Sequence, residues 1–143
     1  MFSGESEHAV DEKGRIVIPP KFRDILGRSF ILTQGFDGCL IAYPPDRFQQ
    51  VTEELQKLSY SQARHRNIQR LMLYSAEPCE IDKQGRVLIP PGLRAAAAIQ
   101  REVVIVGLID KLEIWAKQKW QEYLNQARPN FEDLAEGLDG IRL

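Results

Sequence analysis

The strongest constraint on this chain is a thirteen-residue motif that occurs twice. Residues 11–23 read DEKGRIVIPPKFR, residues 82–94 read DKQGRVLIPPGLR, and seven of the thirteen positions are identical. An internal repeat indicates a chain built from copies of one structural unit. In a chain of 143 residues, each copy has a length at which an isolated domain is only marginally stable. The sequence therefore predicts two similar halves that pack on each other or on another subunit.

Each copy of the motif contains the local signals of a turn, a strand and a helix. An Asp side chain accepts hydrogen bonds from nearby backbone groups and Gly adopts positive φ, which together favour a tight turn. The turn-forming residues are Asp11, Gly14, Asp82 and Gly85. The apolar, β-branched residues that follow predict strands at 15–18 and 86–89, buried on both faces. The Pro-Pro pair then ends the strand and starts a short helix.

Each half continues with a hairpin, at 30–43 and 103–116, and the Asp37-Gly38 pair is a typical hairpin turn. A helix with one apolar face follows each hairpin. The sequence therefore predicts a mainly β fold with helices, of the α+β class. Its expected parts are a first half-domain (5–47), connecting helices (48–75), a second half-domain (76–119), and a C-terminal helix with an acidic tail (120–143).

The overall charge gives no indication of a nucleic-acid partner. The net charge is −1 and the pI is about 6.1, whereas nucleic-acid-binding domains are usually basic. The charges are unevenly distributed, however. Residues 57–75 contain four basic and no acidic side chains, and residues 129–143 contain four acidic side chains and one basic. The acidic tail is expected either to be mobile or to dock on a neighbour.

No residue pattern indicates catalysis or a bound cofactor. His8 and His65 are not grouped with a nucleophile, and no phosphate-binding loop or metalloprotease motif occurs. Cys39 and Cys79 lack metal or redox spacing and are expected to be free thiols in a reducing compartment. Neither a signal peptide nor a membrane-spanning run is recognised. The expectation is a cytoplasmic protein that is not an enzyme and has no metal, cofactor, small-molecule substrate or membrane partner.

An arginine follows the turn glycine in both copies, at Arg15 and Arg86. A guanidinium is a planar fork of donors that fits phosphate or the O6/N7 edge of guanine, and a two-stranded ribbon can enter the DNA major groove. Lys13 and Lys83 lie in the same turns and are candidates for phosphate contacts. These four side chains are the candidate DNA-binding residues.

A purely structural role for the same arginines is the alternative. Arg15 would then pair with Asp11, and Arg86 with Asp82, to lock each turn. For the arginines that end the motif, Arg23 and Arg94, the expected role is solvent-exposed or ion-pairing rather than DNA-binding.

The motif D-x-x-G-R-[IV]-x-I-P-x-x-[FL]-R resembles the DNA-binding half-domain of AbrB-like transition-state regulators. Two copies in one chain, with MFSGE at the start and KLEIW at 111–115, closely resemble the MraZ family of bacterial transcriptional regulators. The resemblance extends from Met1 to about Trp120. The D-x-x-G-R pattern alone is moderately specific, and its duplication together with the other segments is strongly specific.

The resemblance implies a duplicated, AbrB-like swapped-hairpin β-barrel with peripheral helices, in which the two halves pair within one chain. It implies sequence-specific binding to repeated DNA boxes upstream of the protein's own division and cell-wall gene cluster, and association with the nucleoid. It also implies a homo-oligomeric ring of about eight to twelve subunits. The family's DNA-contacting arginine corresponds to Arg15, with Lys13 beside it, and Arg86 occupies the same motif position in the second half.

A second interpretation treats the chain as an oligomeric protein-interaction module whose duplicated motif is structural. Its acidic tail, or the helix that carries Arg66 and Arg70, would then bind a protein. Salt dependence separates the two hypotheses, because DNA binding releases counterions and a contact through apolar surface does not. Whether one half or both would contact DNA is left open at the level of sequence.

Overall fold

The computed structural model describes all 143 residues of the chain. The strands are β1 (Glu5–Ala9), β2 (Arg15–Val17), β3 (Ser29–Gln34), β4 (Leu40–Tyr43), β5 (Glu77–Glu80), β6 (Arg86–Leu88), β7 (Glu102–Leu108) and β8 (Lys111–Ala116). The helices are α1 (Pro20–Leu26), α2 (Pro45–Gln56), α3 (Ala63–Leu73), α4 (Pro91–Ala96), α5 (Lys117–Ala127), the 3-10 helix η1 (Arg128–Asn130) and α6 (Phe131–Glu136). This combination of antiparallel strands and helices confirms the predicted α+β class.

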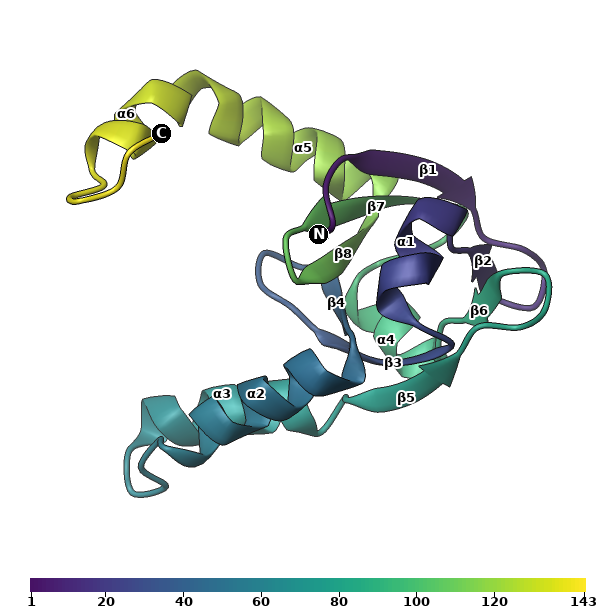
Figure 1. The fold of residues 1–143 in the computed structure, drawn as a ribbon, viewed down its shortest axis with the longest axis horizontal. Helices are drawn as coiled ribbons and strands as arrows, with labels where there is room; N and C mark the ends of the chain where they lie inside the picture. The colour runs from purple at the N-terminus through teal and green to yellow at the C-terminus, as the bar shows by residue number, and fades with distance from the viewer.

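Six strands form one antiparallel sheet in the order β1-β7-β8-β4-β3-β5 (Figure 1). The order interleaves the halves, because β1 of the first half pairs with β7 of the second, and β5 of the second pairs with β3 of the first. The central hairpins, β3–β4 and β7–β8, meet through β4 and β8. The equivalent strands of the two halves are β1 and β5, β3 and β7, and β4 and β8. Exchanging each strand for its equivalent gives the same strand order, read from the other edge of the sheet. The halves are therefore related by an approximate twofold axis, with strands swapped between them.

The other two strands, β2 and β6, pair with each other in a separate antiparallel ribbon. Ile16 lies opposite Val87, and both side chains are buried in the core. Val17 and Leu88 are 41% and 50% exposed, so the prediction that these strands are buried on both faces is wrong. The ribbon instead alternates with the period of two that a strand imposes on its side chains. Its inner face closes the barrel and its outer face meets solvent.

A single hydrophobic core of 21 buried residues joins the two halves. Nine of these residues come from 1–75 and twelve from 76–143. The short helices begin at the predicted Pro-Pro pairs and bury Phe22 and Leu93 against this core. Because the core draws on both halves in similar measure, neither half contains a complete core of its own.

Two helical segments project from the barrel on the side away from the β2–β6 ribbon (Figure 1). One is the α2–α3 hairpin, which is held to the sheet by a small cluster that includes Tyr43, Leu55 and Met72. The other is α5, whose Trp120 packs against Val104 and Trp115, followed by η1 and α6. The α6 helix has no buried residue. None of the helices combines the length and the apolar character that crossing a membrane requires.

Candidate nucleic-acid interface

The side chain of Asp11 organises the first turn of the ribbon. Its Oδ1 atom accepts hydrogen bonds from the backbone N–H groups of Lys13 (2.9 Å) and Arg15 (2.8 Å). Its Oδ2 atom accepts a hydrogen bond of 2.7 Å from Nε of Arg15. Gly14 has a φ of 85°, in the left-handed region that Gly adopts without a steric penalty. The turn has the residues and the geometry that the motif predicts.

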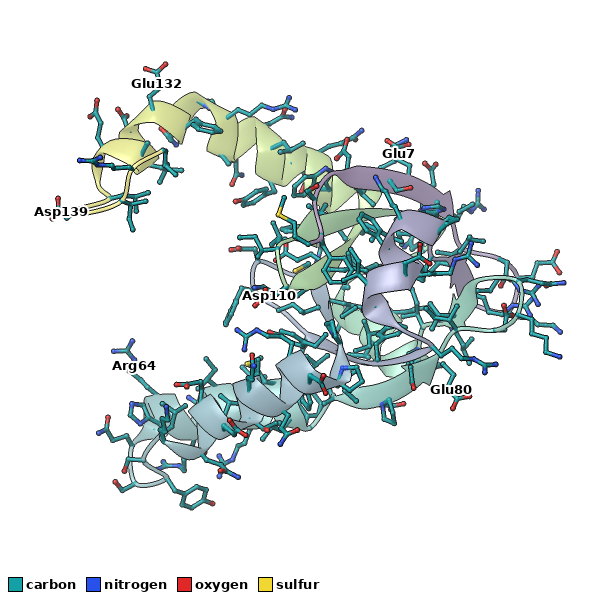
Figure 2. All side chains as sticks on the ribbon, viewed as in Figure 1. Glu7, Arg64, Glu80, Asp110, Glu132 and Asp139 are labelled. Atoms are coloured by element: carbon teal, nitrogen blue, oxygen red, sulfur yellow. The ribbon has the colours of Figure 1, made fainter.

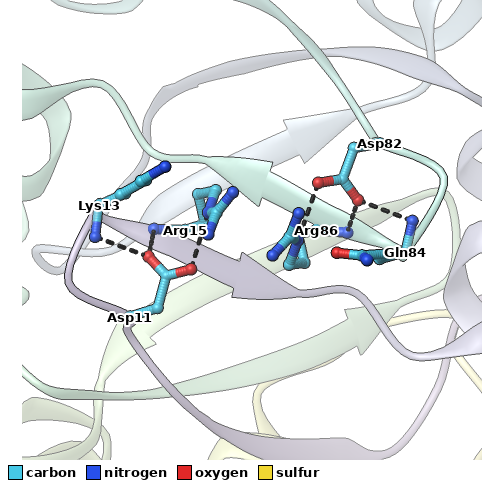
Figure 3. A network of polar contacts seen from close by, with 6 residues as sticks. All are labelled: Asp11, Lys13, Arg15, Asp82, Gln84 and Arg86. Carbon is cyan, nitrogen blue, oxygen red and sulfur yellow. Dashed lines mark hydrogen bonds and ion pairs between the residues drawn. The ribbon is translucent and has the colours of Figure 1, made fainter.

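The second turn repeats this arrangement around Asp82. The carboxylate accepts hydrogen bonds from the backbone N–H groups of Gln84 (2.9 Å) and Arg86 (2.8 Å), and from Nε of Arg86 (2.9 Å). Figure 3 shows the two networks at opposite ends of the ribbon. The ion pairs of the turn-lock hypothesis are therefore present in both copies. They occupy only Nε of each arginine, and the terminal Nη1 and Nη2 atoms make no hydrogen bond within the chain.

Arg15 and Arg86 lie on the same, outer face of the ribbon. Arg15 is opposite Leu88, and Arg86 is opposite Val17, so the two arginines are diagonal neighbours (Figure 3). Diagonal neighbours on one face of an antiparallel pair are about 7–8 Å apart at the backbone. The outer face thus carries two half-buried arginines on one diagonal and two exposed apolar side chains, Val17 and Leu88, on the other. Each half therefore contributes one arginine to a single surface.

The candidate lysines are exposed and flank this surface. Lys13 lies in the turn at one end of the ribbon, and Lys83 lies in the turn at the other. They are not equivalent by the internal symmetry: Lys13 corresponds to Gln84, and Lys83 corresponds to Glu12. Each turn therefore has one lysine, which is the third residue of the first turn and the second residue of the second turn.

Arg23 and Arg94 have a role that the sequence analysis missed. The Arg94 guanidinium lies against Gly14, and the Arg23 guanidinium lies against Gly85. Nε of each arginine is buried without a hydrogen-bond partner. The expectation of a solvent-exposed or ion-paired side chain is therefore wrong, since each arginine packs against the turn of the opposite half. The motif marks both positions, but its spacing could not reveal a contact between the two halves.

The turn glycines provide a test of this packing. A Cβ atom on Gly14 would lie 2.7 Å from Cζ of Arg94, in a backbone conformation with φ of 85°. The left-handed conformation alone costs an L-residue about 1–2 kcal/mol. We expect Gly14→Ala to lower the free energy of unfolding by at least that amount in urea denaturation. Gly92→Ala is the matched control, because that glycine lies in a helix with no atom near the added Cβ. Equal stabilities of the two variants would contradict the packing role of Arg94.

The turn carboxylates are held in the charged form. The backbone N–H of Arg15 lowers the pKa of Asp11 below its ordinary value, and the arginine side chain adds to this effect. The backbone N–H and side chain of Arg86 lower the pKa of Asp82 in the same way. A carboxyl whose folded-state pKa is lowered stabilises the fold above its unfolded pKa, and this contribution is lost as the pH falls through the folded value. Both carboxylates therefore stabilise their turns at neutral pH, and this stabilisation is lost in acid.

This linkage predicts the acid response of a variant. Wild type is expected to lose more stability than Asp11→Asn combined with Asp82→Asn when the pH falls from neutral to below about 4, because only wild type has these carboxylates to protonate. Urea denaturation at a series of pH values measures the difference. A parallel decrease for both proteins would mean that the carboxylates contribute nothing to the acid response.

The charged groups around the ribbon are predominantly basic. The cations are Lys13, Arg15, Arg23, Lys83, Arg86 and Arg94, and the carboxylates are Asp11, Glu12 and Asp82. The ribbon is thus a locally positive surface on a chain whose net charge is −1. No group of His, Cys, Asp and Glu is arranged to hold a metal ion. Cys39 and Cys79 are free and buried, and burial raises the pKa of both thiols.

Comparisons with known proteins agree on one family. The family model described as "MraZ protein, putative antitoxin-like" matches residues 1–71 and again residues 72–140. The transcriptional regulator MraZ of Finegoldia magna is 46% identical over 143 residues, covering all of both chains. The protein of the same name from Lactiplantibacillus plantarum is 46% identical over 138 residues, 96% of this chain and 98% of the relative. That from Heliobacterium modesticaldum is 43% identical over 138 residues, 96% of both.

Proposed function

This chain belongs to the MraZ family, and we propose that it is a sequence-specific, double-stranded-DNA-binding transcriptional regulator. Its proposed targets are repeated boxes upstream of its own division and cell-wall gene cluster. It acts in the cytoplasm, associated with the nucleoid, as a homo-oligomeric ring of about eight to twelve subunits. It catalyses no reaction and uses no cofactor.

The observation that carries the proposal is the outer face of the β2–β6 ribbon. The major groove of DNA admits a two-stranded ribbon, and Arg is the most frequent side chain to bind O6 and N7 of guanine there. Arg15 and Arg86 both project from this face with their Nη atoms free of protein partners. The Asp11 and Asp82 carboxylates orient the guanidinium groups in advance, which lowers the conformational cost of binding. A turn lock and a base contact are therefore compatible roles of the same arginine.

The neighbouring side chains complete a DNA-facing surface. Val17 and Leu88 are the exposed apolar residues of the ribbon, and small apolar side chains can contact the methyl group of thymine in the major groove. Lys13 and Lys83 flank the ribbon at its two ends, where they are proposed to bind phosphates. Phosphate contacts fix the position of a protein on the duplex, and base contacts select the sequence.

Oligomerisation compensates for the modest surface that one subunit offers. A single ribbon presents only two base-reading arginines, and the net charge of the chain is −1. Linking several such ribbons turns later contacts with neighbouring boxes into intramolecular events, which raises the overall affinity. The ribbon lies at the opposite end of the barrel from the helical segments (Figure 1). Contacts between subunits through those segments would leave the ribbon accessible.

The salt dependence of binding tests the proposed function. Affinity for the duplex upstream of the protein's own gene cluster is measured by fluorescence anisotropy at several salt concentrations, beside a scrambled duplex. We expect preference for the first duplex, and a plot of log K against log salt with a slope of about −0.9 per phosphate contacted. Replacing Lys13 by Ala is expected to make that slope shallower by about one unit for each phosphate that the variant no longer binds, for either duplex.

The outcome also decides between the two hypotheses. Absence of any DNA preference, or binding that does not respond to salt, would favour the interaction module with a purely structural motif. The observation that favours this second candidate is the pair of ion pairs, Asp11–Arg15 and Asp82–Arg86, because a purely structural motif would contain them too.

A further inference from the structure

We propose that the C-terminal segment, residues 131–143, binds a groove beside α3 on a second copy of this chain. The inference rests on the proposed homo-oligomer and names the contact through which one subunit holds the next. It is independent of the DNA-binding ribbon, which lies at the other end of the barrel (Figure 1).

The C-terminal segment has an apolar face that nothing in the chain covers. Phe131 and Leu134 are spaced i and i+3 on α6, the spacing of one helical face, and Leu138 follows shortly after the helix ends at Glu136. Phe131 is 71% exposed and Leu134 is 64% exposed. Acidic side chains lie among these residues, at Glu132, Asp133 and Glu136, and Asp139 follows Leu138. Contiguous exposed apolar side chains with a polar rim are typical of a protein-interaction site.

A groove of suitable character lies between α3 and the tip of the β3–β4 hairpin. Its volume is about 690 Å³. Its apolar lining is formed by Phe36, Leu58, Ile68, Leu71 and Met72. Phe36 and Leu71 are 60% and 55% exposed although both are large and apolar. The groove therefore offers apolar surface of its own that is left uncovered in the single chain.

The charges of the two surfaces are complementary. Arg64 lines the groove, and the segment 57–75 that contains α3 has four basic and no acidic side chains. The segment 129–143 has four acidic side chains and one basic. Complementary potentials favour association of the two surfaces and fix their relative orientation. The same complementarity disfavours pairing of two acidic tails or of two basic grooves.

The partner is a second copy because the chain does not fill its own groove. Figure 2 shows Arg64 on the α2–α3 segment and Glu132 and Asp139 on the other projecting segment, with open space between them. A tail that binds the groove of a neighbour leaves its own groove free for the next tail. Such a head-to-tail contact repeats, and it gives a closed ring when the rotation between subunits closes.

A complementation experiment tests this contact. One variant ends after Arg128, which removes the tail and keeps the groove. The other carries Arg64→Glu with Leu71→Glu, two exposed positions, which repels the tail and keeps the tail itself. Each variant alone is expected to be monomeric by light scattering, whereas the wild type is oligomeric. An equimolar mixture is expected to form a 1:1 heterodimer, because the tail of the second variant fits the intact groove of the first.

Three results would overturn the proposal: assembly of either variant like the wild type, a mixture that stays monomeric, or a monomeric wild type. Arg70→Glu is the matched control for the Arg64→Glu part of this variant, because this exposed arginine of α3 lies outside the groove lining and both substitutions change the charge by the same amount. All masses are measured without DNA. DNA binding by the monomeric variants is measured separately, since their Arg15 and Arg86 are intact. Failure of the tail contact and failure of the DNA-binding proposal are therefore distinguishable.

Discussion

The double variant Arg15→Ala, Arg86→Ala is expected to bind the duplex upstream of the protein's own gene cluster on the order of 10- to 10⁴-fold more weakly than wild type. Removing one bidentate interaction with a base costs about 1–3 kcal/mol of discrimination, and a tenfold change in affinity corresponds to about 1.4 kcal/mol. Both arginines lie on one face of the ribbon, so both contribute to the same encounter with DNA. Each single variant is expected to lose about half of this free energy.

The fold of the double variant is expected to change little. Each arginine forms one ion pair with a partly exposed carboxylate, and such surface pairs contribute at most about 1 kcal/mol. The backbone hydrogen bonds of Asp11 and Asp82 do not depend on the arginine side chains. Urea denaturation and the oligomeric mass therefore provide the check that weaker DNA binding does not reflect an unfolded protein.

Two further variants separate charge from geometry. Arg15→Lys with Arg86→Lys keeps the positive charge but cannot form the bidentate fork. It is expected to bind specific and scrambled duplexes almost equally, because non-specific attraction persists while base recognition is abolished. Arg70→Ala removes an exposed arginine of α3 and is the control, for each single alanine variant, for the loss of one positive charge alone. Wild-type preference in the alanine double variant would show that the arginines serve only to lock the turns.

Separating the chain into residues 1–75 and 76–143 is expected to abolish folding of either part as a monomer. In the first part β1 and β3 lose their partners β7 and β5, and the ribbon loses β6. The part retains nine of the 21 residues of the core. A chain of that length already buries too little surface to be securely stable. The covalent link between the halves replaces what would otherwise be an encounter between two chains.

Mixing the two parts is expected to restore a cooperative thermal transition and a 1:1 complex, measured by circular dichroism and light scattering. The approximate symmetry of the halves adds one necessary control. Two copies of the same part could pair with each other, so each part is also examined at low concentration, with its mass. A part that melts cooperatively as a monomer would contradict the shared core.

Much of the local structure could be predicted because it depends on neighbours in the chain. The Asp–Gly turns, the Pro-Pro helix starts and the Asp37-Gly38 hairpin all occur where their residue types indicate. Each of these features is a matter of backbone conformation and of hydrogen bonds over a few residues. The duplicated motif identified the turn arginines for the same reason, since sequence spacing and spatial neighbourhood coincide within a tight turn.

The solvent-exposed face of the ribbon could not be predicted from its residue types. Val17 and Leu88 are apolar and β-branched or bulky, which favours burial, and yet they are exposed beside the two arginines. Both residues depart from the burial that the sequence pattern predicts for this strand pair. Such contradictions are expected where a surface is kept for a partner.

The sequence by itself determined that the chain has two alike halves, the turns that begin each motif, the α+β class and the family to which the chain is similar. Only the tertiary structure decided that β1 and β5 cross to the opposite half, that Arg15 and Arg86 form one surface, and that Arg23 and Arg94 pack against the opposite turns. The reason is the range of the interactions. Turns and helix ends are fixed within a few residues, whereas strand exchange depends on which arrangement buries the most apolar surface of both halves at once.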